Sequence, residues 1–163
     1  MYHFNSEQTA DWWDVEALYD LCFAPGREAL SSYRLRDRVA VVPGLSMVAR
    51  DIDGILGGAI RYWPITVGGQ ATLLLGPVAV HPTRQGEGLG GGLIRDSLAL
   101  AGGQGWRRVM LIGDAPYYQR FGFKKLQGVV MPPPTNPDRV LGLALTSNAW
   151  NGVVGAVRSV FVV

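Results

Sequence analysis

The sequence predicts a single α/β domain over residues 1–163, in which a mixed, mostly antiparallel sheet of six to seven strands is flanked by about four helices. Three strand-like runs joined by short turns lie in the central third of the chain, which predicts an antiparallel meander. A glycine-rich loop, a helix and a further strand follow, and this order predicts a central parallel strand pair joined by a right-handed crossover. With 163 residues, 48% of them apolar, the chain is long enough to bury one substantial core.

The first segment predicts a strand and a helix. Residues 2–8 favour a short strand, and Thr9 or Asp11 can cap a helix over about 10–23. Pro25-Gly26 ends this helix. The apolar face expected for the helix consists of side chains near helical spacing, namely Trp13, Ala17, Leu18, Leu21 and Cys22.

The segment Glu28–Val39 predicts a second short helix, and it contains the densest basic cluster of the chain. Arg34 and Arg38 are four residues apart, with Arg36 between them, so we expect a solvated helix face. The net charge of the whole chain is only +2. A balance so small and scattered does not favour a nucleic-acid partner.

The central third of the chain predicts the antiparallel meander. Residues 46–51 favour a strand, and Asp53-Gly54 is a typical two-residue turn. The run 55–67 is the expected hairpin partner, and Gly68-Gly69 turns the chain into a third strand over 71–80.

The second half predicts the crossover and the far side of the sheet. Residues 89–101 have helical spacing, and Gly102-Gly103 is expected to stop the helix. The buried strand 109–112 should lie parallel to 73–80. A last short helix runs from Asp114 to Gly122, and strand-like runs follow at 123–130, 139–145 and 152–163.

Several classes of protein and site are disfavoured by composition. Cys22 is the only cysteine, which excludes an intrachain disulfide framework and fits a reducing compartment. It lies on an apolar helix face, so we expect a core thiol rather than a nucleophile. No apolar run approaches the length of a membrane helix, and the N-terminus lacks the pattern of a signal peptide. We therefore expect a cytoplasmic protein with no membrane partner. Two distant histidines and one cysteine predict no metal site.

The loop after strand 73–80 is rich in glycine and opens directly into a helix. Such a loop exposes backbone N–H groups to an anion and places a helix dipole behind them. Gly86-x-Gly88-x-x-Gly91 satisfies the dinucleotide-binding fingerprint, with Asp114 near the position of a ribose-binding acid. Three features disfavour a dinucleotide-binding fold. Five residues, His81–Gln85, separate the strand from the glycine loop, and antiparallel strands precede this strand. The chain that follows the loop is also too short for the second half of such a sheet.

Two ordered motifs offer a better explanation. The first is Val80-His-Pro82 followed by Gln85-Gly-Glu-Gly88-Leu-Gly90, and the second is Tyr118-Gln-Arg-Phe-Gly122-Phe123, with one helix and one strand between them. This arrangement resembles the GNAT superfamily of acyl-CoA-dependent N-acetyltransferases over roughly residues 40–130. The Tyr-x-Arg-Phe-Gly-Phe ending resembles the subgroup that includes aralkylamine acetyltransferases and many bacterial members.

The resemblance implies a splay between strands 73–80 and 108–112 that receives the pantetheine arm of acetyl-CoA. Backbone groups of the first strand would bind the arm, and N–H groups of the loop would hold the pyrophosphate. For Gly91 and Gly92, close packing of the helix on the sheet explains the glycine equally well. The implied cofactor-binding residues are Val78, Ala79, Val80, Gln85, Gly86, Glu87, Gly88, Leu89, Gly90 and Gly91.

The resemblance also implies that Tyr118 is the catalytic residue, a general acid that protonates the departing CoA thiolate after a primary amine attacks acetyl-CoA in a ternary complex. Tyr117 is better assigned to packing or to the acceptor pocket. The chain departs from the family at Leu111 and Asp114, where many relatives carry Asn and Ala, so it lacks the Asn that contacts pantetheine in those relatives. A general base is not identifiable, and His81 is better explained as a solvated loop residue.

The acceptor stays open between a small-molecule amine and a peptide or protein amine. Aromatic residues gather in the segments expected to border it, as core side chains or as a pocket: Trp12, Trp13, Tyr19, Phe23, Tyr33, Tyr62 and Trp63. A non-catalytic acetyl-CoA sensor or partner module is the alternative function. The apolar run 153–163 predicts either a homodimer contact or completion of the sheet within one chain.

Overall fold

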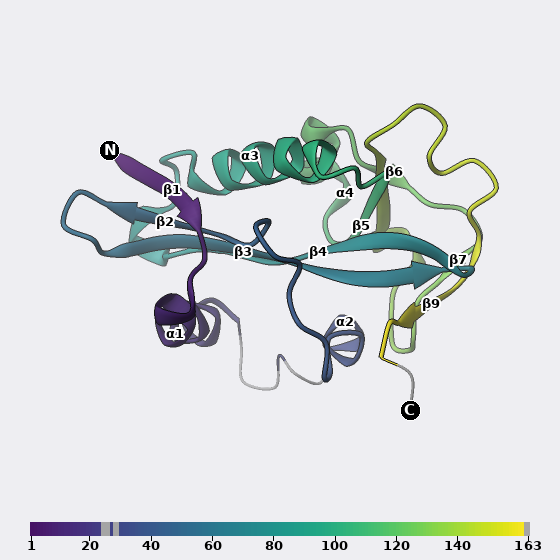
Figure 1. Cartoon of the computed structure of the whole chain (residues 1–163), viewed down its shortest axis with the longest axis horizontal. Helices are drawn as coiled ribbons and strands as arrows, with labels where there is room; N and C mark the ends of the chain where they lie inside the picture. The colour runs from purple at the N-terminus through teal and green to yellow at the C-terminus, as the bar shows by residue number, and fades with distance from the viewer. Residues whose placement is uncertain (24–26, 28–29, 162–163) are drawn as a thin grey trace.

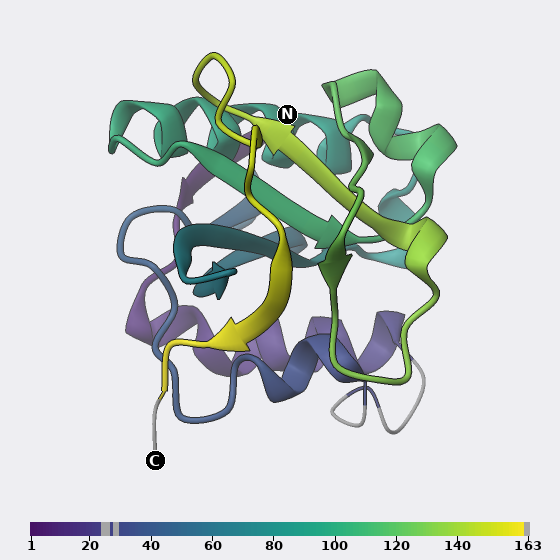
Figure 2. The same cartoon turned by 90° about the vertical axis from the view of Figure 1, so that its right-hand side faces the viewer.

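The computed structural model describes residues 1–23, 27 and 30–161. One mixed sheet forms the middle layer, with α3 (Leu89–Gly103) on one face and α1 (Trp12–Cys22) and α2 (Ser31–Arg34) on the other (Figures 1 and 2). The predicted α/β class, with its mostly antiparallel sheet and central parallel pair, is confirmed.

The three-stranded meander is confirmed in order and direction, since β2 (Met47–Asp51), β3 (Leu56–Val67) and β4 (Gln70–Val80) lie side by side, each antiparallel to the next. The first strand, β1 (Tyr2–Ser6), adds an antiparallel pairing with β2 that was not predicted. The Asp53-Gly54 turn is held by the Asp51 carboxylate, which accepts the N–H groups of Asp53 and Ile55, both at 2.9 Å. A local side-chain bond of this kind lets a short turn satisfy its own backbone groups.

The far side of the sheet is divided more finely than expected. β5 (Arg108–Ile112) pairs with β8 (Val140–Ala144), which inserts between β5 and β6 (Lys124–Lys125). The predicted run 123–130 splits into β6 and β7 (Val129–Val130), and the sheet over the described residues has nine strands rather than the six to seven expected.

β9 (Gly155–Ser159) pairs with the end of β3 and with β7. The C-terminal run therefore completes the sheet within the chain, as Figure 2 shows for the yellow strand.

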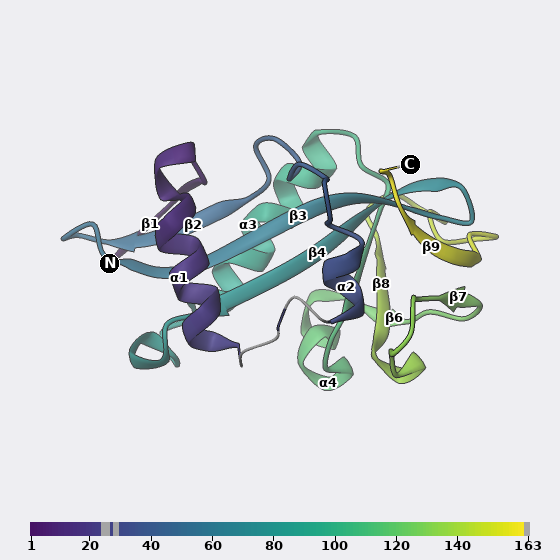
Figure 3. The same cartoon turned by 90° about the horizontal axis from the view of Figure 1, so that it is seen from below.

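The predicted apolar face of α1 is wrong in part. Val15, Leu18 and Tyr19 are its buried residues, whereas Trp13 is 80% and Leu21 is 57% exposed. The helix lies across β3 and β4, and an i, i+3, i+4 stripe centred on Leu18 is what reaches them (Figure 3). Trp13 and Leu21 extend the apolar spacing but face away from the sheet.

The second helix is shorter than predicted. Among described residues it covers Ser31–Arg34, while Pro25-Gly26 and Glu28 lie outside the described part of the chain. Arg38 adopts φ +58°, so Arg34 and Arg38 do not share a helix face. The solvated basic face is therefore wrong for Arg36, which is buried.

The helix α3 ends later than its first glycine pair indicates. Gly102 and Gly103 are its last residues, and the left-handed residue that stops it is Gly105, with φ +89°. The Gly105 N–H donates to Gly102 and the Trp106 N–H donates to Ala101, which together form a Schellman cap. The last short helix is confirmed as α4 (Ala115–Tyr118) plus a 3-10 turn (Gln119–Phe121), closed by Gly122 at φ +93°.

The main core lies between α3 and the sheet. Leu93 and Ile94 of α3 pack there against buried residues of β3, β4 and β5. A second, smaller cluster under α1 covers the opposite face, so β3 and β4 are buried on both sides. Within the described chain, no helix is long and apolar enough to cross a bilayer.

Candidate functional site

The parallel pair β4–β5 opens like a V. The two strands are paired only at Leu73–Val109 and Leu74–Met110, while β4 continues to Val80 along β3. The register of β3 on β4 shifts between Ile60 and Tyr62, opposite the point where Gly76 adopts φ +130°. A bulge of this kind bends a strand, and here it turns the second half of β4 away from β5.

The alternation of the β3–β4 ladder shows which backbone groups face this opening. Along an antiparallel ladder, every second residue pair is hydrogen-bonded. Because the His81 N–H donates to the Gly57 carbonyl at 2.8 Å, the pair two residues further along, Ala79 and Ala59, is hydrogen-bonded as well. The backbone groups of Val78 and Val80 therefore point away from β3, on the side where β5 has diverged. The splay that the resemblance implies is therefore present, and the backbone groups of Val78 and Val80 face into it.

The glycine loop opens a cavity of about 490 Å³ at the N-terminus of α3, named here the loop cavity. Gly86 and Gly88 adopt φ +85° and +80°, which side chains other than glycine rarely tolerate. The first intrahelical bond runs from the Gly92 N–H to the Gly88 carbonyl, so the N–H groups of Leu89, Gly90 and Gly91 precede the hydrogen-bond ladder. All the predicted cofactor-binding residues except Glu87 line the loop cavity: Val78, Ala79, Val80, Gln85, Gly86, Gly88, Leu89, Gly90 and Gly91.

The three glycines at the start of α3 differ in what surrounds them. A Cβ on Gly92 would lie 2.5 Å from the Phe4 ring, so this glycine permits close packing of α3 on β1. A Cβ on Gly90 would meet only ordinary contacts with Tyr117 and Val80, inside the loop cavity. Gly91 also lines the cavity, beside the flexible end of Arg95. Helix packing therefore explains Gly92 but neither Gly90 nor Gly91.

Positive charge surrounds the loop cavity. Arg84, Arg95 and Arg120 line it; Arg84 is held by the Asp51 carboxylate at 2.9 Å. The Glu87 carboxylate points elsewhere and accepts the Tyr2 hydroxyl at 2.9 Å. Free N–H groups at a helix N-terminus, with three guanidinium groups beside them, suit a ligand with several phosphate charges.

Tyr118 stands at the open end of the splay. Its ring packs on the backbone of Gly113, where an added Cβ would lie 2.6 Å from the ring, and edge-on against Phe123 at 5.9 Å between centroids. Its hydroxyl makes no hydrogen bond to any described residue. Burial raises the pKa of Tyr118 to about 12, so the hydroxyl is a neutral donor at physiological pH.

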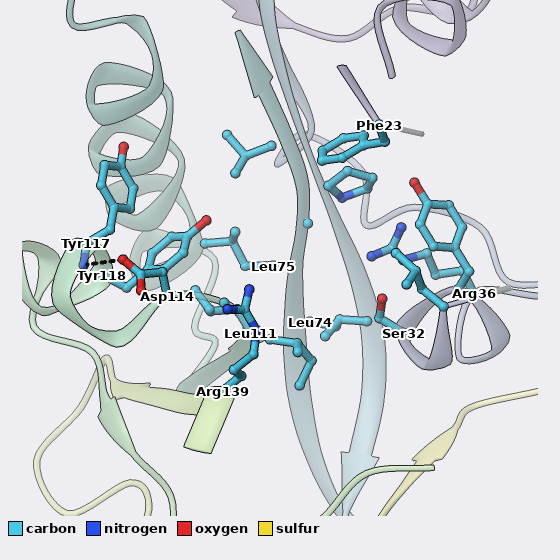
Figure 4. Close-up of a pocket in the computed structure, with 17 residues that line it drawn as sticks. Phe23, Ser32, Arg36, Leu74, Leu75, Leu111, Asp114, Tyr117, Tyr118 and Arg139 are labelled. Carbon is cyan, nitrogen blue, oxygen red and sulfur yellow. Dashed lines mark hydrogen bonds between the residues drawn. The ribbon is translucent and has the colours of Figure 1, made fainter. Parts of the chain in front are cut away.

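A second cavity of about 530 Å³ lies on the other side of Tyr118 and is named here the Tyr118 cavity (Figure 4). It shares Val78, Tyr117 and Tyr118 with the loop cavity, so the two meet at these residues. Figure 4 shows Tyr117, Tyr118 and Asp114 on one side of the strands and Phe23 and Arg36 on the other.

The predicted aromatic cluster is only partly brought together. Phe23 and Tyr33 line the Tyr118 cavity, whereas Tyr19 and Tyr62 are fully buried in the core. Trp13 is on the surface. Trp12 and Trp63 line a neighbouring groove with Tyr33. The prediction that most of these side chains are ordinary core or surface aromatics is the more accurate one.

Three charged residues line the Tyr118 cavity; the sequence singled out Asp114 only as a possible ribose-binding acid, and it assigned Arg36 and Arg139 to no site. Asp114 caps α4 through a bond from the Tyr117 N–H at 3.2 Å, and it is the one carboxylate among the described lining residues. Arg36 and Arg139 also line the cavity, from segments about 100 residues apart in the chain. No local pattern marks them, since only the fold brings them together.

Other residues weighed for chemistry lie outside both cavities. His81 Nδ1 faces Thr83, with the Thr83 hydroxyl at 2.9 Å, so the histidine stabilises its own loop. The Cys22 thiol is 3.4 Å from the Val80 carbonyl, and burial raises its pKa, which makes the thiolate less accessible. Over the described residues, no group of three or more metal-ligating side chains comes together.

This geometry is that of a protein that binds an extended, phosphate-bearing ligand across an opened pair of parallel strands. The family model of the acetyltransferase (GNAT) domain matches residues 43–125. The chain belongs to the GNAT family of acetyltransferases.

Relatives of the chain agree with this membership. The uncharacterized N-acetyltransferase YjhQ of Escherichia coli is 31% identical over 78% of this chain and 74% of its own length. The structure of a GNAT acetyltransferase from Brucella melitensis in complex with acetyl-CoA has a TM-score of 0.74 and 31% identity, covering 97% of this chain and 95% of that one. That of E. coli YhbS in complex with CoA has a TM-score of 0.84 and 26% identity, covering 97% of this chain and 89% of that one.

Proposed function

We propose that the chain transfers an acetyl group from acetyl-CoA to a primary amine by direct attack within a ternary complex. The observation that carries this proposal is the meeting of two cavities at Tyr118. One cavity has the features of a phosphate site, and the other is lined by apolar and charged side chains suited to a second substrate. Two substrates that enter from opposite sides would bring their reacting atoms together beside one buried hydroxyl.

Acetyl-CoA would occupy the loop cavity and the splay. The backbone groups of Val78 and Val80 would bind its pantetheine arm, and the N–H groups from Gln85 to Gly91 would hold its pyrophosphate. The complexes of the Brucella relative with acetyl-CoA and of YhbS with CoA support this assignment. When bound, acetyl-CoA supplies an activated acyl group and a thiolate leaving group. The chain holds the two substrates in position and provides the proton that the sulfur takes up.

Tyr118 would act as the general acid. The attacking amine forms the new C–N bond and loses a proton, while the C–S bond breaks and Tyr118 donates its hydroxyl proton to the sulfur. A neutral acceptor amine requires no strong base, and the proton it releases restores the tyrosine through solvent. Because the hydroxyl has no hydrogen-bond partner among the described residues, it is available to the sulfur without breaking an existing bond.

The acceptor would bind in the Tyr118 cavity. Phe23 and Tyr33 give this cavity an aromatic wall, which fits an arylalkylamine or another amine with an apolar body. A cavity of about 530 Å³ also lies within the range typical of small-molecule sites. We therefore favour a small-molecule amine over a peptide or protein amine.

The test joins binding and turnover. Calorimetric titration with acetyl-CoA measures the first substrate, and the release of free thiol with a panel of amines and peptides measures transfer. Tight acetyl-CoA binding with thiol release supports the proposal. Binding without release for any acceptor would favour a sensor or partner module, and absence of acetyl-CoA binding would overturn the assignment of the loop cavity.

A matched pair of variants on α3 separates the loop cavity from general effects on the helix. Gly90→Val places a branched side chain in the cavity, whereas Gly102→Val places the same side chain at the other end of α3, where nothing lies within 4 Å of an added Cβ. We expect Gly90→Val to weaken acetyl-CoA binding about tenfold or more, which is about 1.4 kcal/mol. Equal effects of the two variants would contradict the assignment.

A further inference from the structure

Arg36 is buried without the partners that a buried guanidinium requires. The residue is only 9% exposed, and its guanidinium lies over the ring of Tyr33 at 4.1 Å and near that of Trp63 at 5.6 Å. Its Nε and Nη1 atoms are fully covered and have no hydrogen-bond acceptor among the described residues. Two aromatic faces hold the group in place but accept no N–H bond in its plane.

The other buried arginines show that this chain normally pairs such groups. Arg61 is held by the Glu7 carboxylate at 2.9 Å and by Glu16. Arg108 donates to two backbone carbonyls, each at 2.7 Å. Burying a charge without a partner costs several kcal/mol, and native structures seldom leave one uncompensated. Arg36 departs from this pattern at a position that borders a cavity.

The place of Arg36 in that cavity indicates what its partner is. It lines the Tyr118 cavity, across β4 from Tyr118 and Asp114 (Figure 4). Gly76 faces it without a side chain, since a Cβ there would lie 3.6 Å from Nη2. Arg139 also lines the cavity, but on the side of Asp114 and Tyr118, so Arg36 is the guanidinium group at the remote end (Figure 4). A ligand in the cavity therefore meets a cation at the end remote from Tyr118.

We propose that the acceptor is a small amine that also carries an oxyanion group, a carboxylate or a phosphate, and that Arg36 binds this group. The proposal rests on the proposed acetyltransferase function and specifies its second substrate. The anion would complete the hydrogen bonds of Nε and Nη1, and the amine would lie at the other end, near Tyr118. There Asp114 is placed to attract its ammonium form before the proton is lost.

Matched amines test the proposal directly. Phenylalanine is compared with phenylalaninamide and phenethylamine, and O-phosphoethanolamine with ethanolamine, each by thiol release at saturating acetyl-CoA. We expect the anionic member of at least one series to have a kcat/KM about tenfold or more above its neutral partner, as a hydrogen-bonded charge pair contributes. The series that responds distinguishes carboxylate from phosphate. Equal or better use of the neutral amines in both series would overturn the proposal.

Substitution of either of two arginines by methionine tests which one causes the preference for anionic amines. Arg36→Met removes the buried charge, and Arg34→Met removes an exposed one two residues away. We expect Arg36→Met to raise KM for the anionic amine about tenfold or more and to abolish the preference for anionic over neutral amines. Arg34→Met should keep the preference. Loss of the preference in Arg34→Met, or its retention in Arg36→Met, would refute the role of Arg36.

Stability without an acceptor gives a readout that does not depend on finding the substrate. If Arg36 awaits an anion, Arg36→Met relieves an unpaired buried charge, and the thermal unfolding midpoint should rise. If Arg36 only supports Tyr33 and Trp63, the midpoint should fall, and the proposal is refuted. Acetyl-CoA titrated into Arg36→Met should bind as in the wild type. Absence of acetyl-CoA binding in the wild type would instead refute the proposed acetyltransferase function.

Discussion

Replacing Tyr118 with phenylalanine removes one oxygen atom from the point where the two cavities meet. The ring would keep its contacts with Gly113 and Phe123, and no hydrogen bond to a described residue is lost. The fold should therefore be unaffected, so any change in turnover reports on the hydroxyl itself. General acids commonly contribute about 10²- to 10⁴-fold to a rate.

The raised pKa of Tyr118 lowers the contribution to the rate that we expect from its hydroxyl. A hydroxyl with a pKa of about 12 is a weaker acid than a thiol with a pKa of about 8.5, so complete transfer to the thiolate is unfavourable by about 5 kcal/mol. The rate effect then comes mainly from the hydrogen bond that the hydroxyl donates to the sulfur as negative charge develops, and its proton passes to the sulfur as the proton released by the amine restores the tyrosine. A hydrogen bond to a charged group contributes about 1.5–3 kcal/mol, which corresponds to about 10- to 150-fold in rate. We expect kcat to fall by that factor in Tyr118→Phe, with acetyl-CoA binding unchanged.

The assay measures initial rates of thiol release at saturating acetyl-CoA, with Tyr62→Phe as a matched control. Tyr62 is fully buried, its hydroxyl lies 2.8 Å from that of Ser97, and it lines neither cavity. Its loss should cost about 1 kcal/mol of stability and leave kcat unchanged. Tyr118→Phe should instead lower kcat and leave the stability unchanged. An unchanged kcat in Tyr118→Phe would refute the role of its hydroxyl, whatever the stability.

Three further predictions concern stability. Gly92→Ala places a Cβ 2.5 Å from the Phe4 ring, and we expect it to destabilise the fold by about 1–3 kcal/mol, although alanine favours a helix; an unchanged unfolding midpoint would contradict the packing. Glu7→Gln weakens the buried ion pair of Glu7, which is 6% exposed, with Arg61, which is 3% exposed. We expect the free energy of unfolding, measured with urea, to fall by about 3 kcal/mol. A loss within about 0.5 kcal/mol would show that the remaining carboxylate suffices. At alkaline pH, unfolded tyrosines lose their proton near pH 10, whereas folded Tyr118 keeps it until about pH 12. Unfolding then releases a proton, so the free energy of unfolding falls as the pH rises from about 10 to 12. The slope of this free energy against pH should be smaller in Tyr118→Phe by up to about 1.4 kcal/mol per pH unit. Equal slopes in the variant and the wild type would contradict the raised pKa.

Local patterns were sufficient to predict the elements that build the splay. Two-residue turns fixed the antiparallel meander, because a short connection leaves neighbouring strands little choice of partner. The glycine loop was recognisable because φ values such as those of Gly86 and Gly88 restrict the residue type. The motif at Tyr118 was found for a similar reason, since Gly122 must close the turn that follows it.

Features that depend on distant contacts were not predictable in the same way. The spacing of apolar residues in α1 fitted a face through Trp13, but the position of the helix across β3 and β4 buries Val15 and Tyr19 beside the predicted Leu18. The insertion of β8 beside β5 joins segments with a long intervening chain, and no local signal specifies that order. Arg36 could not be told from the neighbouring surface arginines, because its burial depends in part on the approach of Trp63 from β3, a contact between distant segments.

The charges around the Tyr118 cavity bear on how an acceptor is oriented as well as on how it is bound. An amine without an anionic group could lie in the cavity in either direction, because aromatic and aliphatic walls discriminate poorly between its ends. A group that pairs with Arg36 removes this freedom and directs the amine toward Asp114 and Tyr118. Orientation of this kind accelerates a reaction between two bound substrates even where affinity changes little. The unpaired guanidinium of Arg36 thus connects the specificity of the enzyme to its rate, and the same substitution should affect both for anionic acceptors alone.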